Sequence, residues 1–434
     1  MPISARSEPF GPEILPREEL VALQLERLRA TVELVLRAQP LGASRLRAAG
    51  IEAAEDLSSL DALNEVEFAL KSDLREHYPF GLLAVPRDQL VRLHASSGTH
   101  GKPTVVGYTR GDLETWTELM ARCMTIAGVR PGMMVHNANG YGLFTGGLGF
   151  HQGGERIGCT VVPVSGGQTT RQVMLLRDLG ANVLICTPSY ALVLGQAIED
   201  PDSLPLELGL FGGEPWTEGI RTEIERTLPL RAVNFYGLSE MCGPGVAVEC
   251  LEQRDGLHVM EDHFLVEVID PDTGRTLEPG GFGELVFTTL TKEALPLIRY
   301  RTGDLGRLTA EPCPCGRTTV RLTDLGGRRD DMLIIRGVNI HPSNVEHVLL
   351  RVEGVAPYYQ LIVTREGPLD QLALHCEPAD GSTSDRDALA EKVAGVLREH
   401  TGLRIDVRVL DPGGVPRSEG KAVRVVDRRG EWRA

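Results

Sequence analysis

The chain has 434 residues, of which 24% are charged and 42% hydrophobic, and its formal net charge is −15. This composition is that of a globular protein long enough for more than one domain. The acidic balance argues against nucleic acid or a membrane surface as a partner, and no apolar run is long enough to cross a bilayer. Because the amino terminus lacks an apolar signal region, we expect a cytoplasmic protein.

The first strong pattern is a helix. Val21, Leu25, Leu28, Val32 and Val35 recur at helical spacing and predict an amphipathic helix over roughly residues 17–38.

A dense run of hydroxyls, glycines and one lysine follows at residues 96–103. Glycine lets the main chain approach an anion, and hydroxyls and an ammonium supply hydrogen bonds and charge, so the run is typical of a phosphate-binding loop. Its spacing differs from that of the Gly-x-x-x-x-Gly-Lys-Ser/Thr loop, and such a run also suits a surface turn. The run reads Ser96, Ser97, Gly98, Thr99, His100, Gly101, Lys102 and Pro103.

From Val161 onward, short apolar runs alternate with helix-like stretches. The runs are 161–164, 183–186, 208–211 and 232–236, and the helical stretches begin near Thr169, Ser189 and Trp216. This rhythm predicts a mostly parallel sheet covered by helices, whose ligands bind at the carboxyl ends of the strands. Two of the runs lead into the glycine-containing segments 212–215 and 236–240.

After about residue 260 the pattern becomes richer in strands. Runs 264–269 and 284–289 are separated by the turn 271–274, and the charged segment 327–331 is a candidate linker. The last hundred residues have an α+β pattern, with a helix that ends near Gly402.

Five motifs in a fixed order carry a family resemblance. They are the run 96–103, Tyr236-Gly237-Leu238-Ser239-Glu240, Arg299-Tyr300-Arg301-Thr302-Gly303-Asp304-Leu305, Gly327-Arg328-Arg329-Asp330-Asp331 and Gly420-Lys421. The chain resembles the adenylate-forming superfamily of acyl-CoA synthetases, adenylation domains and luciferases, and most closely its phenylacetate-CoA ligase branch. The stretches 141–147, 186–190, 214–216, 288–300 and 332–342 extend the resemblance over nearly the whole chain.

The resemblance implies an α/β fold in two parts. A large N-terminal domain, residues 1–329, would hold mostly parallel sheets covered by helices plus a β-rich subdomain. A small mobile α+β domain, residues 330–434, would rotate about the hinge residue Asp330 and carry the catalytic residue Lys421.

The resemblance also implies the reaction. A carboxylate attacks the α-phosphorus of ATP to give an acyl adenylate and pyrophosphate, and a thiol, usually that of coenzyme A, then displaces AMP. Lys421 would neutralise charge in the first transition state, and Glu240 would hold Mg²⁺. Residues 96–102 would hold the β- and γ-phosphates, with His100 where the family usually has threonine.

Further residues would bind the nucleotide and the acid. Asp304 sits in a Gly-Asp turn, where it could instead cap the turn, and would accept both ribose hydroxyls. The expected nucleotide-binding residues are Gly213, Glu214, Pro215, Tyr236, Gly237, Ser239, Asp304 and Arg328. The expected substrate pocket comprises Asn139, Tyr141, Phe144, Gly212, Gly213, Phe235 and Gly237, with Trp216 as another apolar wall.

Two departures from the branch bear on which acid is used. Asn139 replaces a tyrosine, and Gly213 replaces an alanine, so we expect a roomier pocket with a carboxamide in it. A buried amide requires a polar partner, which favours a hydroxy- or amino-substituted aryl acid over unsubstituted phenylacetate. The acceptor stays open between coenzyme A and a carrier protein, amine or other nucleophile; a catalytically silent homologue is a third reading, and a homodimer is plausible for the branch.

A separate pattern concerns metal. Cys313 and Cys315 flank Pro314 and point two thiols the same way, and Cys250 and His258 lie upstream. Three cysteines and a histidine form a regular structural zinc set with no open position. Buried free thiols beside a hydrogen-bonded histidine are the alternative.

Overall fold

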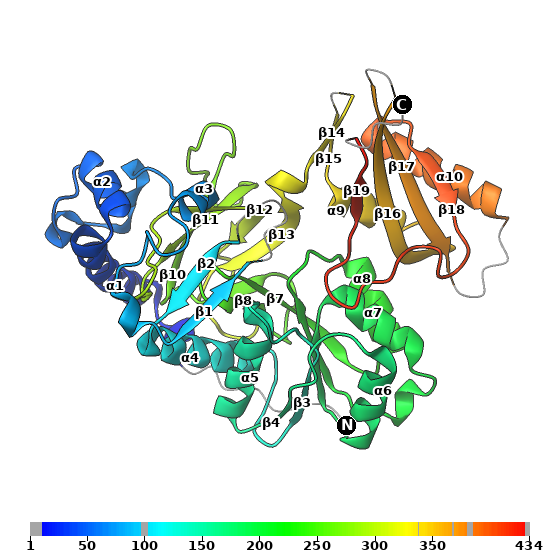
Figure 1. The fold of residues 1–434 in the computed structure, drawn as a ribbon, viewed down its shortest axis with the longest axis horizontal. Coiled ribbons are helices and arrows are strands. Elements are labelled where there is room, and N and C mark those ends of the chain that lie inside the picture. Colours follow the sequence, from blue (N-terminus) through cyan, green and yellow to red (C-terminus); the bar gives the residue numbers. More distant parts are fainter. Residues whose placement is uncertain (1–10, 97–102, 337, 367–368, 380–384, 430–434) are drawn as a thin grey trace.

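The computed structural model describes residues 11–96, 103–336, 338–366, 369–379 and 385–429. It has a large lobe, which contains the N-terminal three quarters of the chain, and a small lobe drawn in orange and red in Figure 1. The helices are α1 Arg17–Ala38, α2 Pro40–Ala48, α3 Lys71–Glu76, α4 Arg110–Ile126, α5 Thr145–Ile157, α6 Thr169–Asp178, α7 Pro188–Ala197, α8 Glu218–Thr227, α9 Pro342–Leu349 and α10 Arg386–Thr401. In the described part of the chain, none of them combines the length and apolarity needed to cross a membrane.

One eleven-stranded sheet organises the large lobe. Its strand order is β10-β11-β12-β13-β9-β8-β7-β6-β5-β3-β4. These strands are β3 Met134–Asn137, β4 Thr160–Val162, β5 Val183–Cys186, β6 Leu208–Gly212, β7 Arg231–Leu238, β8 Gly243–Glu249, β9 Leu257–Val259, β10 Phe264–Ile269, β11 Gly283–Thr289, β12 Tyr300–Thr309 and β13 Arg321–Arg328. A separate antiparallel pair is formed by β1 Arg92–Ala95 and β2 Val105–Tyr108.

The parallel part of the sheet is buried on both faces. Strands β4, β3, β5, β6 and β7 pair in parallel. The positions of β4, β5, β6 and β7 confirm the four predicted runs, whereas β3 was not among them. Along β6, Leu210 packs into the core that contains α4 and α5, whereas the next residue, Phe211, packs into the core under α6, α7 and α8. Burial on alternate sides explains why these strands read as continuous apolar runs.

The β-rich region predicted after residue 260 extends the same sheet. Strand β7 pairs in parallel with β6 and antiparallel with β8, so the sheet changes direction there. The turn predicted at Gly303-Asp304 is wrong, because both residues lie within β12. Gly303 has a φ of 79°, and the β11–β12 register shifts at this point, so glycine permits a bulge inside the strand.

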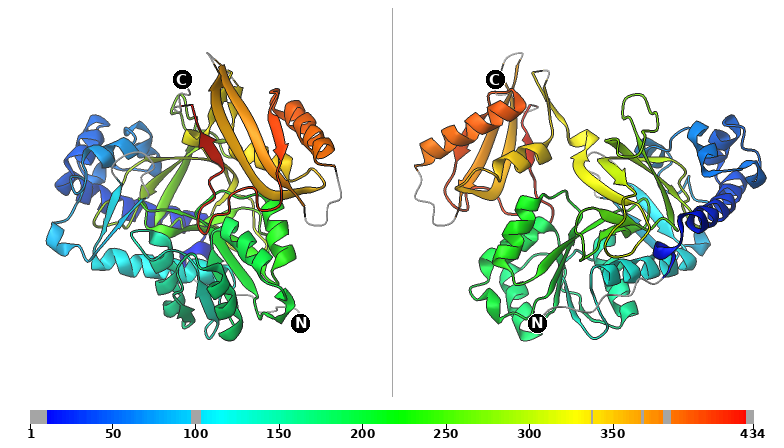
Figure 2. Two further views of the ribbon diagram at one scale, coloured as in Figure 1. Left: turned by 45° about the vertical axis from the view of Figure 1, so that its right-hand side comes forward. Right: turned by 180° about the vertical axis from the view of Figure 1, so that it is seen from behind.

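The small lobe has its own sheet and core. Strands β16 Val355–Glu366, β17 Leu369–Pro378, β18 Asp406–Val409 and β19 Val425–Asp427 form a sheet of order β18-β17-β16-β19, preceded by the hairpin of β14 Leu333–Ile335 and β15 Val338–Ile340. Helices α9 and α10 complete the core of this lobe. Both views in Figure 2 show the lobe standing away from α1 and α2 and touching the large lobe near α7 and α8.

Candidate active site

The turn that joins β7 to β8 is held by two side chains distant in sequence. The Tyr108 hydroxyl lies 3.1 Å from the Cys242 carbonyl oxygen and 3.4 Å from that of Ser239. The ammonium of Lys292 donates to the Met241 carbonyl at 2.9 Å and lies 3.9 Å from the centre of the Tyr108 ring. These contacts fix the turn that carries the expected magnesium ligand.

That ligand, Glu240, is 5% exposed. The Tyr300 hydroxyl lies 3.3 Å from its Oε1 and donates to it. Burial lowers the pKa of Lys292, while Asp112 and Glu240 raise it by favouring its charged form. The Glu240 carboxylate is therefore oriented by a hydroxyl and lies near a buried cation.

Asp304, in β12, pairs with one residue on the neighbouring strand β13 and with one on β7, which lies further along the sheet. Its Oδ2 accepts a hydrogen bond from the Tyr236 hydroxyl at 2.6 Å, and its Oδ1 lies 2.8 Å from an Arg328 nitrogen. Arg328 is the cross-strand partner of Asp304 in β13. Burial, and then the Asp304 charge, raise the pKa of Tyr236 well above its usual value, so Tyr236 remains a donor.

Lys421 reaches the large lobe from the small one. Its ammonium lies 5.0 Å from the centre of the Phe144 ring, and its Cε lies 3.7 Å from the position that a Cβ on Gly213 would take. The residue as a whole is exposed, but desolvation around the ammonium lowers its pKa. Asp304 and Arg328 both act on that ammonium electrostatically, Asp304 raising its pKa and Arg328 lowering it.

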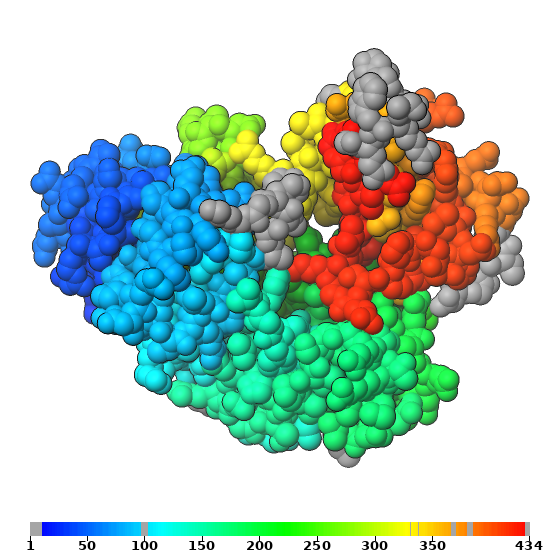
Figure 3. Space-filling model, in the orientation of Figure 1, coloured from blue at the N-terminus to red at the C-terminus, as the bar shows by residue number. Residues whose placement is uncertain are grey.

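The residues on either side of Lys421 are bound to the large lobe. The Thr187 hydroxyl donates to the Gly420 carbonyl at 2.8 Å, and the Ala422 amide donates to Glu214 Oε2 at 2.7 Å. In Figure 3 this red segment passes from the small lobe onto the green part of the large lobe. The carboxylate of Glu214 thus faces the Lys421 segment, and the neighbouring Pro215 is exposed.

Several expected pocket residues lie in or next to the core. Phe235 is buried against Phe150, with ring centres 5.1 Å apart. The Tyr141 hydroxyl accepts from Asn137 at 2.8 Å and lies 3.2 Å from His151 Nδ1, and burial raises the pKa of Tyr141 to about 12.

Three small or polar positions complete the pocket set. Asn139 packs beside Gly146, and among the described residues its carboxamide has no hydrogen-bond partner. A Cβ on Gly237 would collide with the backbone of Gly243, and one on Gly212 would collide with that of Phe235. Close approach of neighbouring strands therefore accounts for both glycines.

Trp216 does not join this set. Its ring packs edge-on against Phe211 at 6.0 Å and lies under the Arg221 guanidinium at 4.7 Å. Phe211 belongs to the core beneath α6, α7 and α8, whereas Phe235 belongs to the core on the opposite face of the sheet. The Trp216 ring therefore packs with the core beneath α6, α7 and α8, on the other face of the sheet from Phe235.

The expected phosphate-binding run joins β1 to β2. Ser96 and Thr104 close its base, with the Ser96 amide donating to the Thr104 carbonyl at 3.0 Å. Ser97, Gly98, Thr99, His100, Gly101 and Lys102 lie outside the described residues.

The expected hinge residue follows β13. Asp330 lies in a short 3-10 helix, Arg329–Asp331, between β13 and β14. Arg329 donates to the Pro271 carbonyl at 2.6 Å, and the Ser343 hydroxyl donates to Gly326. The segment just before Asp330 is therefore bound to the large lobe through Arg329 and to α9 of the small lobe through Gly326.

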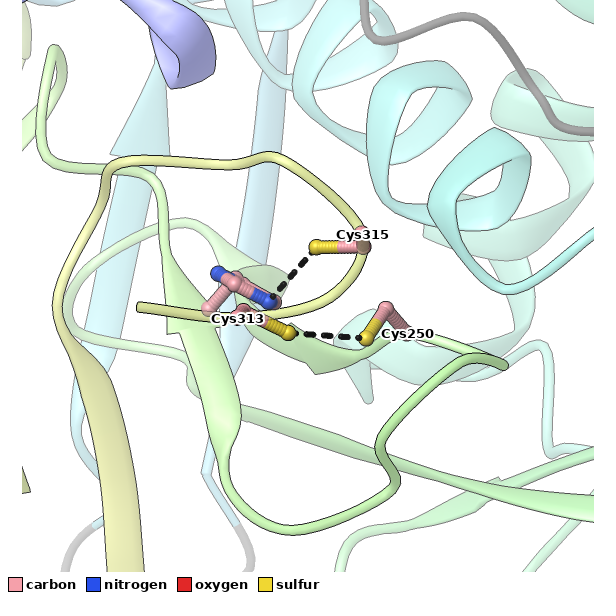
Figure 4. Close-up of side chains that lie close together, drawn as sticks. Cys250, Cys313 and Cys315 are labelled. Carbon is pink, nitrogen blue, oxygen red and sulfur yellow. Dashed lines mark hydrogen bonds between the residues drawn. The ribbon is translucent and has the colours of Figure 1, made fainter. Parts of the chain in front are cut away.

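The four expected zinc ligands come together. Cys250, His258, Cys313 and Cys315 place their ligand atoms within 4.8 Å of one another. Figure 4 shows the three thiols facing one another, with Cys250 Sγ 3.6 Å from Cys313 Sγ. Cys315 Sγ lies 3.3 Å from His258 Nε2.

The surroundings of this cluster suit a metal. A hydrogen bond from Cys250 lowers the pKa of Cys315, burial opposes that effect, and a hydrogen bond from His258 adds to it. The other ring nitrogen of His258 lies 3.2 Å from the Thr319 hydroxyl, the kind of contact that orients a histidine ligand. The donors, their spacing and this support all fit zinc.

The sequence alone does not indicate which residues hydrogen-bond to the expected site residues and support them. Contacts to the expected site residues and to the Lys421 segment come from Tyr108, Thr187, Ser189, Lys292 and Tyr300. The last four lie in stretches that carry the family resemblance, 186–190 and 288–300, but the sequence alone assigns none of them a role. Tyr108 lies outside every such stretch.

Comparison with known proteins shows the family of the chain. A model described as AMP-binding enzyme matches residues 17–290, and one described as AMP-binding enzyme C-terminal domain matches residues 337–429. The chain therefore belongs to the AMP-binding enzyme family.

Its full-length relatives include phenylacetate-coenzyme A ligases. That of Thermus thermophilus is 51% identical, over 96% of this chain and 98% of the relative. That of Escherichia coli is 47% identical, over 95% of each chain. The crystal structure of 2-hydroxyisobutyryl-CoA ligase in the postadenylation state with 2-HIB-AMP matches with a TM-score of 0.91 at 29% identity, over 99% of this chain and 94% of that one.

The same ligase in another state is less similar. Its complex with 2-HIB-AMP and CoA in the thioesterification state gives a TM-score of 0.72 over the same coverage. The lobes of the present structure are thus arranged more like those of the postadenylation state.

Proposed function

We propose that this protein uses ATP to convert an aryl carboxylic acid into an acyl adenylate, and then transfers the acyl group to coenzyme A with release of AMP. It is an AMP-forming acid–thiol ligase. The observation that carries the proposal is the position of Lys421, which comes from the small lobe and lies on the large lobe beside Gly213 and Phe144. Full-length similarity to ligases named for phenylacetate and coenzyme A supports the same reaction.

Each expected residue has a role that its surroundings suit. Asp304 would accept the ribose hydroxyls, with Tyr236 and Arg328 orienting it. Glu240 would hold Mg²⁺, which supplies positive charge to the phosphate oxygens when bound. Lys421 would approach the α-phosphate, where a positioned charge stabilises the transition state. Residues 96–102 would hold the pyrophosphate that leaves.

Adenylation requires Lys421 at the nucleotide site, and thioester formation requires Lys421 to leave that site. We place the domain boundary at residues 329 and 330, with Asp330 as the hinge. The contrast between TM-scores of 0.91 and 0.72 for two states of one related ligase supports a rotation of this kind.

The acid is expected to carry a polar group on its ring. The Asn139 carboxamide has no hydrogen-bond partner among the described residues, so it is available to such a substituent. The test is a panel of phenylacetate, benzoate and their hydroxy and amino derivatives with ATP and Mg²⁺, with and without coenzyme A, followed by mass spectrometry of AMP and acyl-CoA. A strong preference for unsubstituted phenylacetate would refute the ring-substituted substrate. AMP release without acyl-CoA would indicate a carrier protein or another acceptor, and no turnover of any acid would refute the ligase.

We also propose a structural zinc ion at Cys250, His258, Cys313 and Cys315. The ion would join the β8–β9 hairpin, through Cys250 and His258, to the loop between β12 and β13. Four protein ligands leave no open position, so the ion would stabilise the fold and take no part in catalysis.

Replacing one ligand should remove the metal. In Cys250→Ser, elemental analysis should fall from one zinc per chain to none, and the free energy of unfolding should fall by roughly 4 kcal/mol or more, as in other losses of a bound metal. Cys159→Ser, a cysteine outside the cluster, is the control and should keep its zinc. Wild-type protein that is purified without zinc and is unaffected by chelators would contradict the site.

A further inference from the structure

The carboxylate of Glu214 bridges two segments that belong to different lobes. Its Oε1 accepts a hydrogen bond from the Ser189 amide at 2.8 Å and another from the Ser189 hydroxyl. Its Oε2 accepts one from the Ala422 amide at 2.7 Å. Ala422 directly follows Lys421, so Glu214 binds the backbone of the segment that carries the catalytic ammonium.

The first turn of α7 supplies the rest of this attachment. Ser189 lies in that turn, where unpaired amides and the helix dipole favour a carboxylate. Thr187, the N-cap of the same helix, donates to the Gly420 carbonyl. The start of α7 and Glu214 therefore hold the backbone on both sides of Lys421 and leave its side chain pointing at Gly213 and Phe144.

These bonds can exist only while the lobes are in the present arrangement. Glu214 and Ser189 belong to the large lobe and Ala422 to the small one, so a rotation that removes Lys421 must break the bond to Ala422. We propose that Glu214 is a positioning residue for adenylation: it holds Lys421 in place for the first half-reaction and releases it for the second. This inference rests on the proposed function only in assigning Lys421 to adenylation.

The negative charge of Glu214 also supports the positioning of Lys421. The groups that act on the Lys421 ammonium are Glu214, Asp304, Arg328 and Lys71. Desolvation lowers the pKa of Lys421, and Glu214 is the largest of the contributions that oppose this. Removing the Glu214 charge should therefore lower that pKa further, and the ammonium should be lost at a lower pH.

Glu214→Gln tests the proposal without changing the shape of the side chain. A carboxamide has one acceptor oxygen, so it cannot serve both the Ser189 and the Ala422 amides. We expect pyrophosphate release to slow by about 10- to 100-fold, the cost of one unsatisfied buried donor, with little change in the KM for ATP. Formation of acyl-CoA from a supplied acyl adenylate should stay within about twofold of wild type, and the alkaline limb of the adenylation rate should move to lower pH.

Glu218→Gln is the matched control. Glu218 lies four residues further on, is largely exposed and pairs with Arg221 outside the Lys421 segment, so both half-reactions should be unaffected. Hydrogen–deuterium exchange of the 419–424 peptide adds a readout that needs no acid. The Ala422 amide should exchange faster in Glu214→Gln than in wild type or in Glu218→Gln.

The outcomes separate the two proposals. Unchanged exchange together with unchanged adenylation would overturn the positioning role, as would a raised KM for ATP at constant kcat, which would assign Glu214 to the purine. An equal loss in both half-reactions would also overturn it, since that indicates damage to the fold. Faster exchange at Ala422 in an enzyme that adenylates no aryl acid would support the attachment and refute the proposed function instead.

Discussion

Lys421→Ala is expected to lose at least 10²- to 10³-fold in the rate of adenylation, the usual effect of removing one positioned charge from a transition state. The proposed chemistry uses the ammonium of this side chain, which crosses the lobe interface to lie near Phe144, while the adjoining Cε lies near Gly213. ATP should still bind, because Asp304 and Glu240 belong to the large lobe. The residue is exposed, so the free energy of unfolding should change by less than about 0.5 kcal/mol.

The measurement is pyrophosphate release in a single turnover, beside thioester formation from a supplied acyl adenylate and coenzyme A. The rate of pyrophosphate release should fall by at least 10²- to 10³-fold, while the rate of thioester formation should stay close to that of wild type. Lys421→Arg, which keeps the charge but changes its geometry, should retain more of the first rate than the alanine variant. Equal loss in both half-reactions would contradict the assignment of Lys421 to adenylation.

Four of the five parallel strands, β4, β5, β6 and β7, could be predicted from the sequence to within about two residues at each end. Strand β3 ends in His136 and Asn137, so it does not read as an apolar run and was not predicted. Strands β5 and β6 are buried on both faces, so they appear as unbroken apolar runs, and the helices that follow begin at clear capping residues. The antiparallel half was harder to predict. A glycine that permits a bulge in β12 looks the same in sequence as one that ends a strand, which is why Asp304 was expected in a turn.

Some features of the candidate site could likewise be predicted from the sequence, and others could not. Cysteines and a histidine are rare enough that their grouping was predictable, although Cys250 and Cys313 are 63 positions apart. The sequence does not show that Trp216 and Phe235 pack on opposite faces of the sheet, because an aromatic residue after a strand can lie on either face. The bond between Glu214 and Ala422 spans 208 positions and two lobes, and no periodicity or local motif could have indicated it.

The lobe arrangement can be locked chemically. A Cβ on Gly219, in α8 of the large lobe, would lie 3.0 Å from the Cβ of Leu350, which follows α9 in the small lobe. A disulfide needs a Cβ–Cβ separation of about 3.8 Å, so Gly219→Cys with Leu350→Cys should form one after a slight adjustment. Each single variant serves as a control that cannot form the bond.

Rapid-quench measurement of pyrophosphate and acyl-CoA from the oxidised double variant tests the alternation of Lys421 most directly. The oxidised enzyme should release one pyrophosphate per chain in a burst and then form no acyl-CoA until a reductant is added. Acyl-CoA formation at the wild-type rate while the disulfide stays intact would contradict a rotation between the half-reactions.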